Sequence, residues 1–389
     1  MKDIEISNSI KYIGVDDKDI DLFESQYIVP NGISYNSYLI EDEKTVLMDT
    51  VDKRKTKEWL ENLDKALNGK ELDYLVISHL EPDHSANIAK IIEKFPNVKL
   101  IGNSKTFELL PQFFEINDLD ERKIVVAEAE EINIGEHTLQ FFMAPMVHWP
   151  EVMVTYEKTE KILFSADGFG KFGALDTDEE WDCEARRYYF NIVGKYGAQV
   201  QALLKKAATL DIKMICPLHG PVLKENLEHY INQYDTWSSY KPETEGIFIA
   251  YASIHGNTAD AAKELKDILQ KNGAPKVAIT DLAREDMAEA IEDAFRYNKI
   301  ILAASSYNFG VFPPMEQFLN ILKGKNYQNR VVGIVENGTW APSAARTMKT
   351  ILEQMKDIKI CEPVVTIKTT LNKDSKKALE ELAKNILEA

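Results

Sequence analysis

The chain has 389 residues, with 46 Lys or Arg and 63 Asp or Glu, so its formal net charge at pH 7 is −17. Phosphate backbones and anionic lipid headgroups would repel such an acidic chain, which argues against nucleic acid and membrane surfaces as partners. The length favours two domains, and the apolar fraction of 44% suits ordinary globular cores.

Cysteine usage and the distribution of apolar residues bear on the compartment. None of the three cysteines forms a C-x-x-C pair, so neither a disulfide framework nor a cysteine-ligated metal centre is expected. Residues 1–5 carry no apolar signal core, and no apolar run approaches the ~20 residues that span a bilayer. We therefore expect a soluble, cytoplasmic protein.

Up to residue 77 the sequence predicts short strands and one helix. The runs 37–40 and 45–49 flank an acidic turn at 41–43, which is typical of a hairpin. A helix is expected over 55–67. The apolar run 72–77 then indicates a buried strand that leads into the first candidate site.

The stretch Ser78-His79-Leu80-Glu81-Pro82-Asp83-His84 places four potential metal ligands within six positions. In an extended segment His79 and Glu81 project to the same side, because side chains alternate along a strand. Asp83 and His84 are adjacent and diverge, so two metal ions accommodate the four groups better than one. The alternative is a solvated polar loop. The position between a strand and a following helix favours a functional loop on a rigid scaffold.

Further ligand-type side chains follow strand-like runs downstream. His148 lies in the loop 145–150, Asp167 follows the run 162–165, and His219 follows the run 214–216. Taken singly, each histidine is more often a hydrogen-bonded structural residue than a ligand. Together with the first stretch they form a set that we expect to converge at one rim of the fold. This set consists of His79, Glu81, Asp83, His84, His148, Asp167 and His219.

The coarse pattern predicts two domains of different architecture. Strands alternating with helices, including helices expected over 104–114 and 179–208, indicate two sheets sandwiched by helices. The polar segment 240–246 contains Pro and Gly, so we place the boundary there, with domains 1–245 and 246–389. In the second domain, strand-like runs that alternate with helical runs predict a doubly wound parallel sheet. Its strand-like runs are 247–251, 277–280, 299–303, 331–335 and 363–367.

Three loops of the second domain form a candidate cofactor site, because ligands of doubly wound sheets bind at the carboxyl ends of the strands. The first loop opens a helix with hydroxyl residues and Gly, which suits a phosphate. It has neither a Walker A lysine nor G-x-G-x-x-G spacing. The other two place aromatic residues among Asn and Gly, which suits a flat ring. The loops therefore predict FMN, with three ordinary turns as the alternative. The candidate residues are Ser253, His255, Gly256, Asn257, Thr258, Ser305, Tyr307, Asn308, Phe309, Gly310, Asn337, Gly338, Thr339 and Trp340.

With both sets of residues in this order, the chain resembles the flavodiiron proteins, also called A-type flavoproteins, over nearly its whole length. The resemblance implies a fold of mixed α/β and α+β class, with a metallo-β-lactamase-like αββα sandwich followed by a flavodoxin-like domain. It also implies an oxidoreductase that reduces O₂ to water and/or NO to N₂O. The reaction would occur at a non-haem di-iron centre that receives electrons through FMN.

The family pattern implies a ligand set for each of the two irons. One iron would take His79, Glu81 and His148, the other Asp83, His84 and His219, and Asp167 would bridge them. Zinc hydrolases of the same superfamily carry His-x-His-x-Asp-His. Here Glu81 replaces the second histidine, and a hard anionic oxygen shifts the preference toward iron. The alternatives are a dinuclear zinc hydrolase fused to a flavodoxin module, and an electron carrier whose first domain only docks partners.

The resemblance also implies partners. A head-to-tail homodimer, or a dimer of dimers, would bring the FMN of one subunit to the irons of the other. Glu81 and Trp149 would then lie near the partner's flavin, and Trp340 near the flavin of its own domain. Tyr196 is a candidate hydrogen-bond donor beside the iron pocket. The chain lacks the paired C-x-x-C of a rubredoxin module, so we expect a separate electron donor, rubredoxin or another reduced carrier.

Overall fold

The computed structural model describes residues 4–389 and divides into two compact units. The first unit runs to residue 189 and includes 198–235, and the second comprises 190–197 and 236–389. The expected boundary between residues 245 and 246 stays a prediction. Those two residues lie near the start of strand β16 (Thr244–Ala252) of the second unit.

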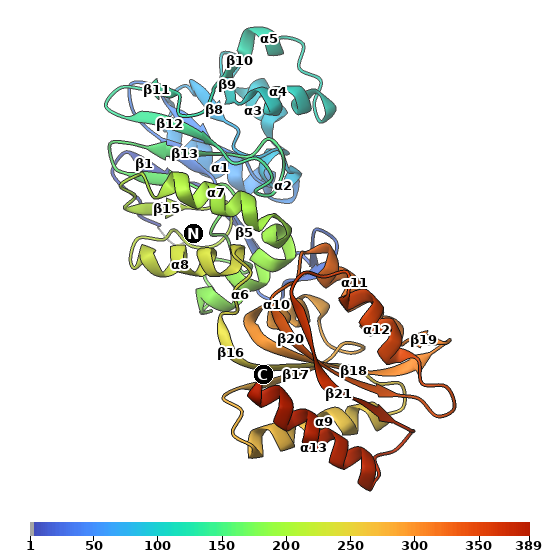
Figure 1. Cartoon of the computed structure of the whole chain (residues 1–389). Coiled ribbons are helices and arrows are strands. Elements are labelled where there is room, and N and C mark those ends of the chain that lie inside the picture. Colours follow the sequence, from blue (N-terminus) through green and yellow to red (C-terminus); the bar gives the residue numbers. More distant parts are fainter. Residues whose placement is uncertain (1–3) are drawn as a thin grey trace. The chain divides into compact units, whose positions relative to one another are not determined.

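The elements up to residue 238 are mostly short (Figure 1). The strands are β1 (Ile10–Tyr12), β2 (Val15–Asp17), β3 (Leu22–Phe23), β4 (Tyr27–Ile28), β5 (Ile33–Tyr35), β6 (Tyr38–Ile40), β7 (Val46–Met48), β8 (Tyr74–Val76), β9 (Lys99–Gly102), β10 (Lys123–Val125), β11 (Glu131–Asn133), β12 (Thr138–Met143), β13 (Met153–Glu157), β14 (Ile162–Phe164) and β15 (Met214–Cys216). The helices are η1 (Lys53–Lys55), α1 (Thr56–Leu67), α2 (Pro82–Ser85), α3 (Ile88–Lys94), α4 (Ser104–Leu109), η2 (Leu110–Gln112), α5 (Leu119–Arg122), α6 (Trp181–Tyr188), the π-helical turn η3 (Tyr189–Val193), η4 (Gly194–Tyr196), α7 (Gly197–Ala207) and α8 (Leu227–Ser238).

Two sheets form the centre of the first unit. One has the order β1-β6-β7-β8-β9-β10 and the other β11-β12-β13-β14-β15. Their facing side chains build one apolar core, in which Met48 and Val76 of the first sheet belong to the same cluster as Phe141 and Phe164 of the second. Burial of these side chains out of water holds the two sheets together. The expected sandwich and the hairpin β6–β7 are confirmed.

Two expected helices differ in extent from the structure. In the region 104–114 the α-helix ends at Leu109 and a 3₁₀ turn continues to Gln112, because Pro111 lacks an N–H and its ring obstructs the preceding turn. The region 179–208 is broken between α6 and α7 by π-helical and 3₁₀ turns. Gly194 lowers helix propensity by ~1 kcal/mol there. The break also marks the passage of the chain into the second unit, where Phe190 stacks on Phe295 with ring centroids 4.2 Å apart.

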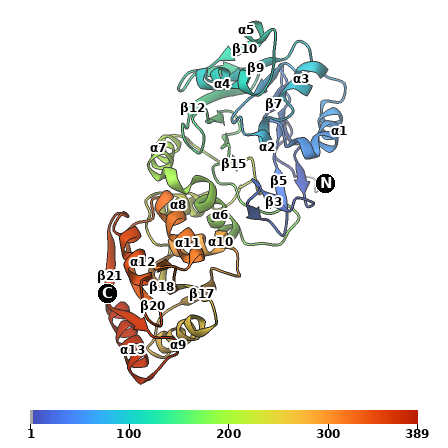
Figure 2. The same cartoon turned by 90° about the vertical axis from the view of Figure 1, so that its right-hand side faces the viewer.

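The second unit is a parallel doubly wound sheet of order β17-β16-β18-β20-β21, as expected. Helices α9 and α13 cover one face and α10, α11 and α12 the other (Figures 1 and 2). Its strands are β16, β17 (Val277–Asp281), β18 (Tyr297–Tyr307), β19 (Gly310–Val311), β20 (Arg330–Asn337) and β21 (Ile358–Ile367). Its helices are α9 (Asn257–Lys271), α10 (Met287–Arg296), α11 (Pro313–Gly324), α12 (Ala344–Leu352) and α13 (Lys373–Glu388).

Candidate functional site: a two-metal centre and a separate ring-binding cavity

Loops at the ends of four strands carry the expected ligands in the first unit. Parallel strands β14 and β15 are hydrogen-bonded neighbours, so their carboxyl ends reach the same rim and bring Asp167 close to His219. The amide of Leu218 donates to the carbonyl of Ala166 at 2.9 Å, which ties the two loops together. The side chain of Asp49 accepts from the amide of Ser78 at 2.7 Å and fixes the start of the loop after β8, which carries His79.

Short turns then orient the individual side chains. Helix α2 begins with Pro82 in its first turn, where a missing N–H costs no hydrogen bond. The carbonyl of His84 accepts from both the amide and the hydroxyl of Thr50, at 2.9 and 2.7 Å. In the loop between β12 and β13, the amide of Met146 donates to the carbonyl of Trp149 at 2.7 Å and closes a turn around His148.

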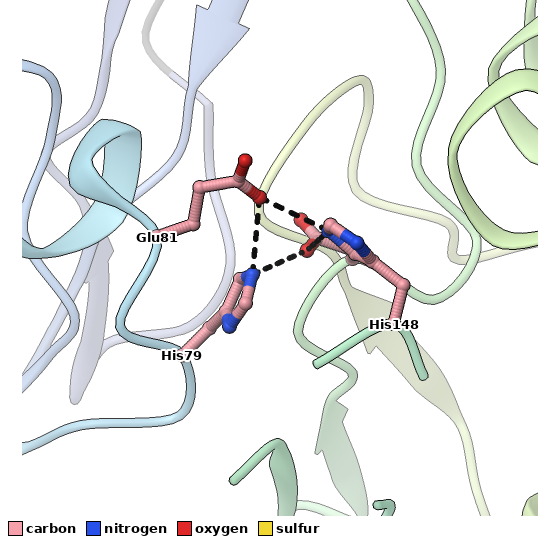
Figure 3. Close-up of side chains that lie close together, drawn as sticks. His79, Glu81 and His148 are labelled. Carbon is pink, nitrogen blue, oxygen red and sulfur yellow. Dashed lines mark hydrogen bonds and ion pairs between the residues drawn. The ribbon is translucent and has the colours of Figure 1, made fainter. Parts of the chain in front are cut away.

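The first ligand group consists of His79, Glu81, His148 and Asp167, whose ligand atoms all lie within 4.8 Å of one another. Figure 3 shows the labelled side chains pointing toward a common centre. Oε2 of Glu81 lies 3.2 Å from Nε2 of His79 and 3.0 Å from Nε2 of His148. Three of the four side chains are buried, so this is a buried ligand group rather than a surface cluster of charge.

The second ligand group consists of Asp83, His84 and His219, all buried. Nε2 of His84 lies 3.0 Å from Nε2 of His219, and Oδ2 of Asp83 lies 3.3 and 3.2 Å from these two nitrogens. Two imidazole lone pairs facing each other repel unless a proton or a metal ion lies between them. Nδ1 of His219 donates to the carbonyl of Ser34 at 2.7 Å, which directs its Nε2 into the group.

Asp167 joins the two groups. Its Oδ2 lies 3.4 Å from Nε2 of His79 and 3.3 Å from Nε2 of His148. Its Oδ1 lies 3.3 Å from Nε2 of His84 and 3.7 Å from Nε2 of His219. One carboxylate oxygen therefore faces each group, which is the geometry of a side chain that bridges two ions.

The electrostatics of the two ligand groups favour cations. Burial opposes ionisation of Glu81, but the neighbouring imidazoles of His148 and His79 outweigh it and hold the pKa of the Glu81 carboxyl below its usual range. Burial opposes protonation of His148, yet Asp167 and Glu81 raise the pKa of His148 to about 9. A proton on His148 thus offsets part of the carboxylate charge, as a bound cation would.

Unsatisfied polar atoms test whether the pocket fits a metal pair. Both carboxylate oxygens of Asp83, both of Asp167 and Nε2 of His148 are buried without a hydrogen-bond partner among residues 4–389. Orphaned buried polar atoms of this kind are destabilising and call for an explanation. These five atoms belong to the two ligand groups, so coordination of two ions would satisfy them together.

Two further side chains next to these groups were missed from the sequence. Tyr188 lies with its ring 5.6 Å from that of His219, and Glu151 accepts a hydrogen bond from Nδ1 of His79 at 2.8 Å. Burial first, then the carboxylate of Asp167, hold the pKa of Tyr188 well above its usual value, so its phenol stays a proton donor. The sequence feature that could have pointed to Glu151 is its position in the same short loop, three residues after His148.

Trp149 and Tyr196, two candidate residues outside the ligand set, lie in different units of the structure. Trp149 packs against the pocket, with its ring 5.1 Å from that of His79 and 6.4 Å from that of Phe113. Tyr196 belongs to the segment 190–197 of the second unit, whereas the ligands belong to the first. Its role as a hydrogen-bond donor to the iron pocket stays a prediction.

The second unit carries a cavity of about 540 Å³ at the carboxyl ends of β16, β18 and β20. This volume lies within the usual range of cofactor sites. The hydroxyls of Thr258 and Ser305 hydrogen-bond at 2.9 Å and join two of the loops at the point where strand order reverses. Its lining is Ser253, Ile254, His255, Asn257, Thr258, Ser305, Ser306, Tyr307, Asn308, Phe309, Asn337, Gly338, Thr339, Trp340, Ala341, Ser343 and Thr369.

The cavity has the features that a flavin with a terminal phosphate would use. Gly256 precedes α9 with φ of 97°, a conformation that L side chains rarely adopt, and this lets the backbone turn into the helix N-terminus. Phe309 and Trp340 are 77% and 87% exposed at the rim, so their ring faces are free to cover a flat ligand. Gly310 pairs with Tyr307 in the β18–β19 hairpin beside the cavity.

Comparisons with known proteins agree with both sites. A family model described as ODP family beta lactamase matches residues 33–220, and a flavodoxin domain model matches 248–366. The chain is 30% identical to an uncharacterized protein of Methanocaldococcus jannaschii over 98% of both chains. It is 31% identical to an anaerobic nitric oxide reductase flavorubredoxin of Aliivibrio fischeri, over 87% of this chain and 70% of that one.

Solved structures extend the likeness to the fold. The rubredoxin oxygen:oxidoreductase of Desulfovibrio gigas has a TM-score of 0.90 and 26% identity, covering 99% of this chain and 97% of that one. A flavo di-iron protein of Thermotoga maritima has a TM-score of 0.87 and 27% identity, covering 97% and 95%. Within residues 4–389, no helix has the length and apolar character needed to cross a membrane.

Proposed function

Because the chain belongs to the flavodiiron proteins, we propose that it reduces O₂ to water and/or NO to N₂O at its two-metal pocket. As a member of this family it is an oxidoreductase that binds FMN and a di-iron centre. The observation that carries the proposal is Asp167, whose two oxygens face two separate ligand groups. Glu81 in the first group supplies the oxygen ligand that favours iron.

Each group would hold one iron, with Asp167 between them. The first group would act through His79, Glu81 and His148, and the second through Asp83, His84 and His219. An iron pair supplies one-electron redox chemistry to a gas molecule in such a pocket, and FMN supplies stored electrons. The side chains of the two groups would hold the ions in place and exclude bulk water by their burial, and Tyr188 keeps its phenolic proton beside His219.

The electron and proton requirements are fixed by the products. Reduction of O₂ to two waters takes four electrons and four protons, and reduction of two NO to N₂O and water takes two of each. We propose rubredoxin or another reduced carrier protein as the external donor. The cavity loops 253–258, 305–310 and 337–340 would hold FMN.

We also propose a head-to-tail homodimer, or a dimer of dimers, that pairs the FMN of one subunit with the iron pocket of the other. Trp149 supports this, because its half-buried ring packs against His79 beside the 39%-exposed Phe113 and so offers an aromatic surface next to the pocket. Sedimentation combined with turnover at high dilution tests the assembly. A monomer with full turnover would contradict it.

The decisive experiment on the function is metal and flavin analysis of the purified protein, followed by anaerobic reduction and separate O₂ and NO consumption assays. We expect about two irons and one FMN per chain, with gas consumption that requires both. The two rates rank O₂ against NO. Zinc in place of iron, without gas consumption, would favour the dinuclear zinc hydrolase instead.

Substitution of Thr258 by Val tests the phosphate end of the FMN cavity. Thr258 is 1% exposed and its hydroxyl bonds Ser305. Val keeps its shape but removes the hydroxyl. Because a hydrogen bond to a charged group contributes about 1.5–3 kcal/mol, we expect at least ~10-fold weaker FMN binding in a fluorescence titration.

The matched control is Thr280→Val, because Thr280 is also buried, with 7% exposed, and lies on β17 of the same unit but outside the cavity lining. Its FMN affinity should equal that of the native chain. Equal affinities for all three proteins would place the phosphate elsewhere in the cavity.

A further inference from the structure

Glu151 is a buried carboxylate that belongs to neither ligand group. It lies in the loop between β12 and β13, three residues after His148, and is 0% exposed. Its Oε1 accepts from Nδ1 of His79 at 2.8 Å and from the amide of Leu80 at 2.9 Å. Its Oε2 is buried without a hydrogen-bond partner in the part of the chain that the structure describes. The hydrogen bonds of this carboxylate are therefore all directed at the His79 segment.

The contact determines what His79 can offer to a metal ion. A carboxylate only accepts, so Nδ1 of His79 donates and carries a proton. In the neutral ring the lone pair then lies on Nε2, which faces Oε2 of Glu81 at 3.2 Å and Oδ2 of Asp167 at 3.4 Å. The second contact of Glu151, to the amide of Leu80, holds the backbone next to His79 as well. Ring orientation and tautomer are thus set by one side chain.

The backbone of Glu151 is fixed by a hydrogen bond from Asn103. The side-chain amide of Asn103 donates to the backbone carbonyl of Glu151 at 2.7 Å. The oxygen of the same amide caps α4 by accepting from the amides of Lys105 and Thr106 at 2.9 and 3.0 Å. Asn103 is 7% exposed. A chain of contacts therefore runs from the start of α4 through Glu151 to the ligand His79.

The two ligand histidines of the second group have different partners. Nδ1 of His219 donates to a backbone carbonyl, that of Ser34. Nδ1 of His84 is buried and has no hydrogen-bond partner within residues 4–389. An anionic partner makes an imidazole a stronger donor to a metal than a neutral carbonyl does. The two metal positions are consequently unequal, with the more basic imidazole in the group of His79.

We propose that Glu151 is a positioning residue that fixes the tautomer and orientation of His79 and strengthens it as a metal ligand, with Asn103 as its support. The inference rests on the proposed function, because it takes the first ligand group to hold iron. The inference predicts a lower ferric/ferrous midpoint potential for the iron held by His79 and His148 than the same iron would have with a neutral side chain in place of Glu151.

The test compares Glu151→Gln with the native holoprotein. Gln keeps the shape and one oxygen acceptor but removes the charge. Partners of metal-binding histidines typically change metal affinity about 10- to 100-fold, so we expect the apparent iron dissociation constant to rise by about that factor in a chelator competition. The midpoint potential of the iron, followed by electron paramagnetic resonance during a redox titration, should shift upward.

Glu157→Gln is the matched control. Glu157 is also 0% exposed, lies on β13 of the same unit, and accepts backbone hydrogen bonds from Thr159 and Glu160 at 2.8 and 2.6 Å. It contacts neither ligand group in the described residues. Its substitution should leave iron affinity and potential unchanged. Native affinity and potential in Glu151→Gln would overturn the inference, as would an equal change in Glu157→Gln.

A second variant decides the matter if Glu151→Gln fails to fold. Asn103→Asp keeps the oxygen that caps α4 but loses the hydrogen bond that the amide donates to Glu151. A measurable loss of iron affinity in this variant supports the inference, and unchanged iron affinity overturns it.

The metal content of the native chain separates this inference from the proposed function. If it holds zinc, the proposed function fails, yet the effect of Glu151→Gln can still be measured with zinc. If it holds two irons that Glu151→Gln does not affect, only the positioning role fails.

Discussion

Substitution of Asp167 by Ala is expected to lower the iron content from about two per chain to less than one and to reduce gas consumption at least ~100-fold. The reason is geometric, because Asp167 is the one side chain among the described residues whose two oxygens face both ligand groups, at 3.3 to 3.7 Å from their histidine nitrogens. Its loss weakens both positions at once and leaves two cations facing each other. Metal analysis and O₂ and NO assays measure the effect.

Neutralising any buried carboxylate has a cost, so a control is needed. Asp17 is 0% exposed in the same unit, pairs with Nε of Arg54 at 2.6 Å and belongs to neither ligand group. Asp17→Asn should lower thermal stability but leave two irons and turnover intact. FMN content should stay native in Asp167→Ala, because the FMN cavity belongs to the other unit. Two irons and full turnover in Asp167→Ala would rule out a bridging role.

The parts of this chain that sequence predicts well are those where one local pattern has one structural solution. The five strands of the second unit follow from apolar runs separated by helices, and all were found, as β16, β17, β18, β20 and β21. The ligand positions follow from strand ends, since a loop after a parallel strand lies at the same rim as its neighbour's. That rule alone places Asp167 beside His219, although 52 residues separate them along the chain.

The parts that sequence did not predict depend on partners that are distant along the chain. Glu151 looks like an ordinary acidic loop residue until its contact with His79, 72 residues away, is known. Tyr188 lies in a region expected to be one long helix, and the break after α6 comes from packing of Phe190 in the second unit. Periodicity reports which face is apolar, but it does not report where an element changes its packing partner.

Replacement of Glu81 by His is expected to shift the bound metal from iron toward zinc by ~10-fold or more in the iron-to-zinc ratio and to abolish most gas consumption. The variant restores the His-x-His-x-Asp-His pattern of zinc hydrolases. It also removes the anionic oxygen that lies 3.2 and 3.0 Å from Nε2 of His79 and of His148. A neutral nitrogen in its place raises the charge of the pocket by one, which disfavours ferric iron most. Metal analysis of protein from cells grown with both metals gives the ratio.

Glu81→Gln separates ligand type from charge, because it keeps an oxygen near the same position but removes the negative charge. If the hardness of an oxygen ligand decides selectivity, Glu81→Gln should remain iron-selective with weaker binding, whereas Glu81→His should not. If charge decides it, both variants should lose iron equally. Native iron content and turnover in Glu81→His would show that the other six ligands determine the metal selectivity by themselves. The difference from zinc hydrolases would then lie in how Asp167 and the two ligand groups face each other.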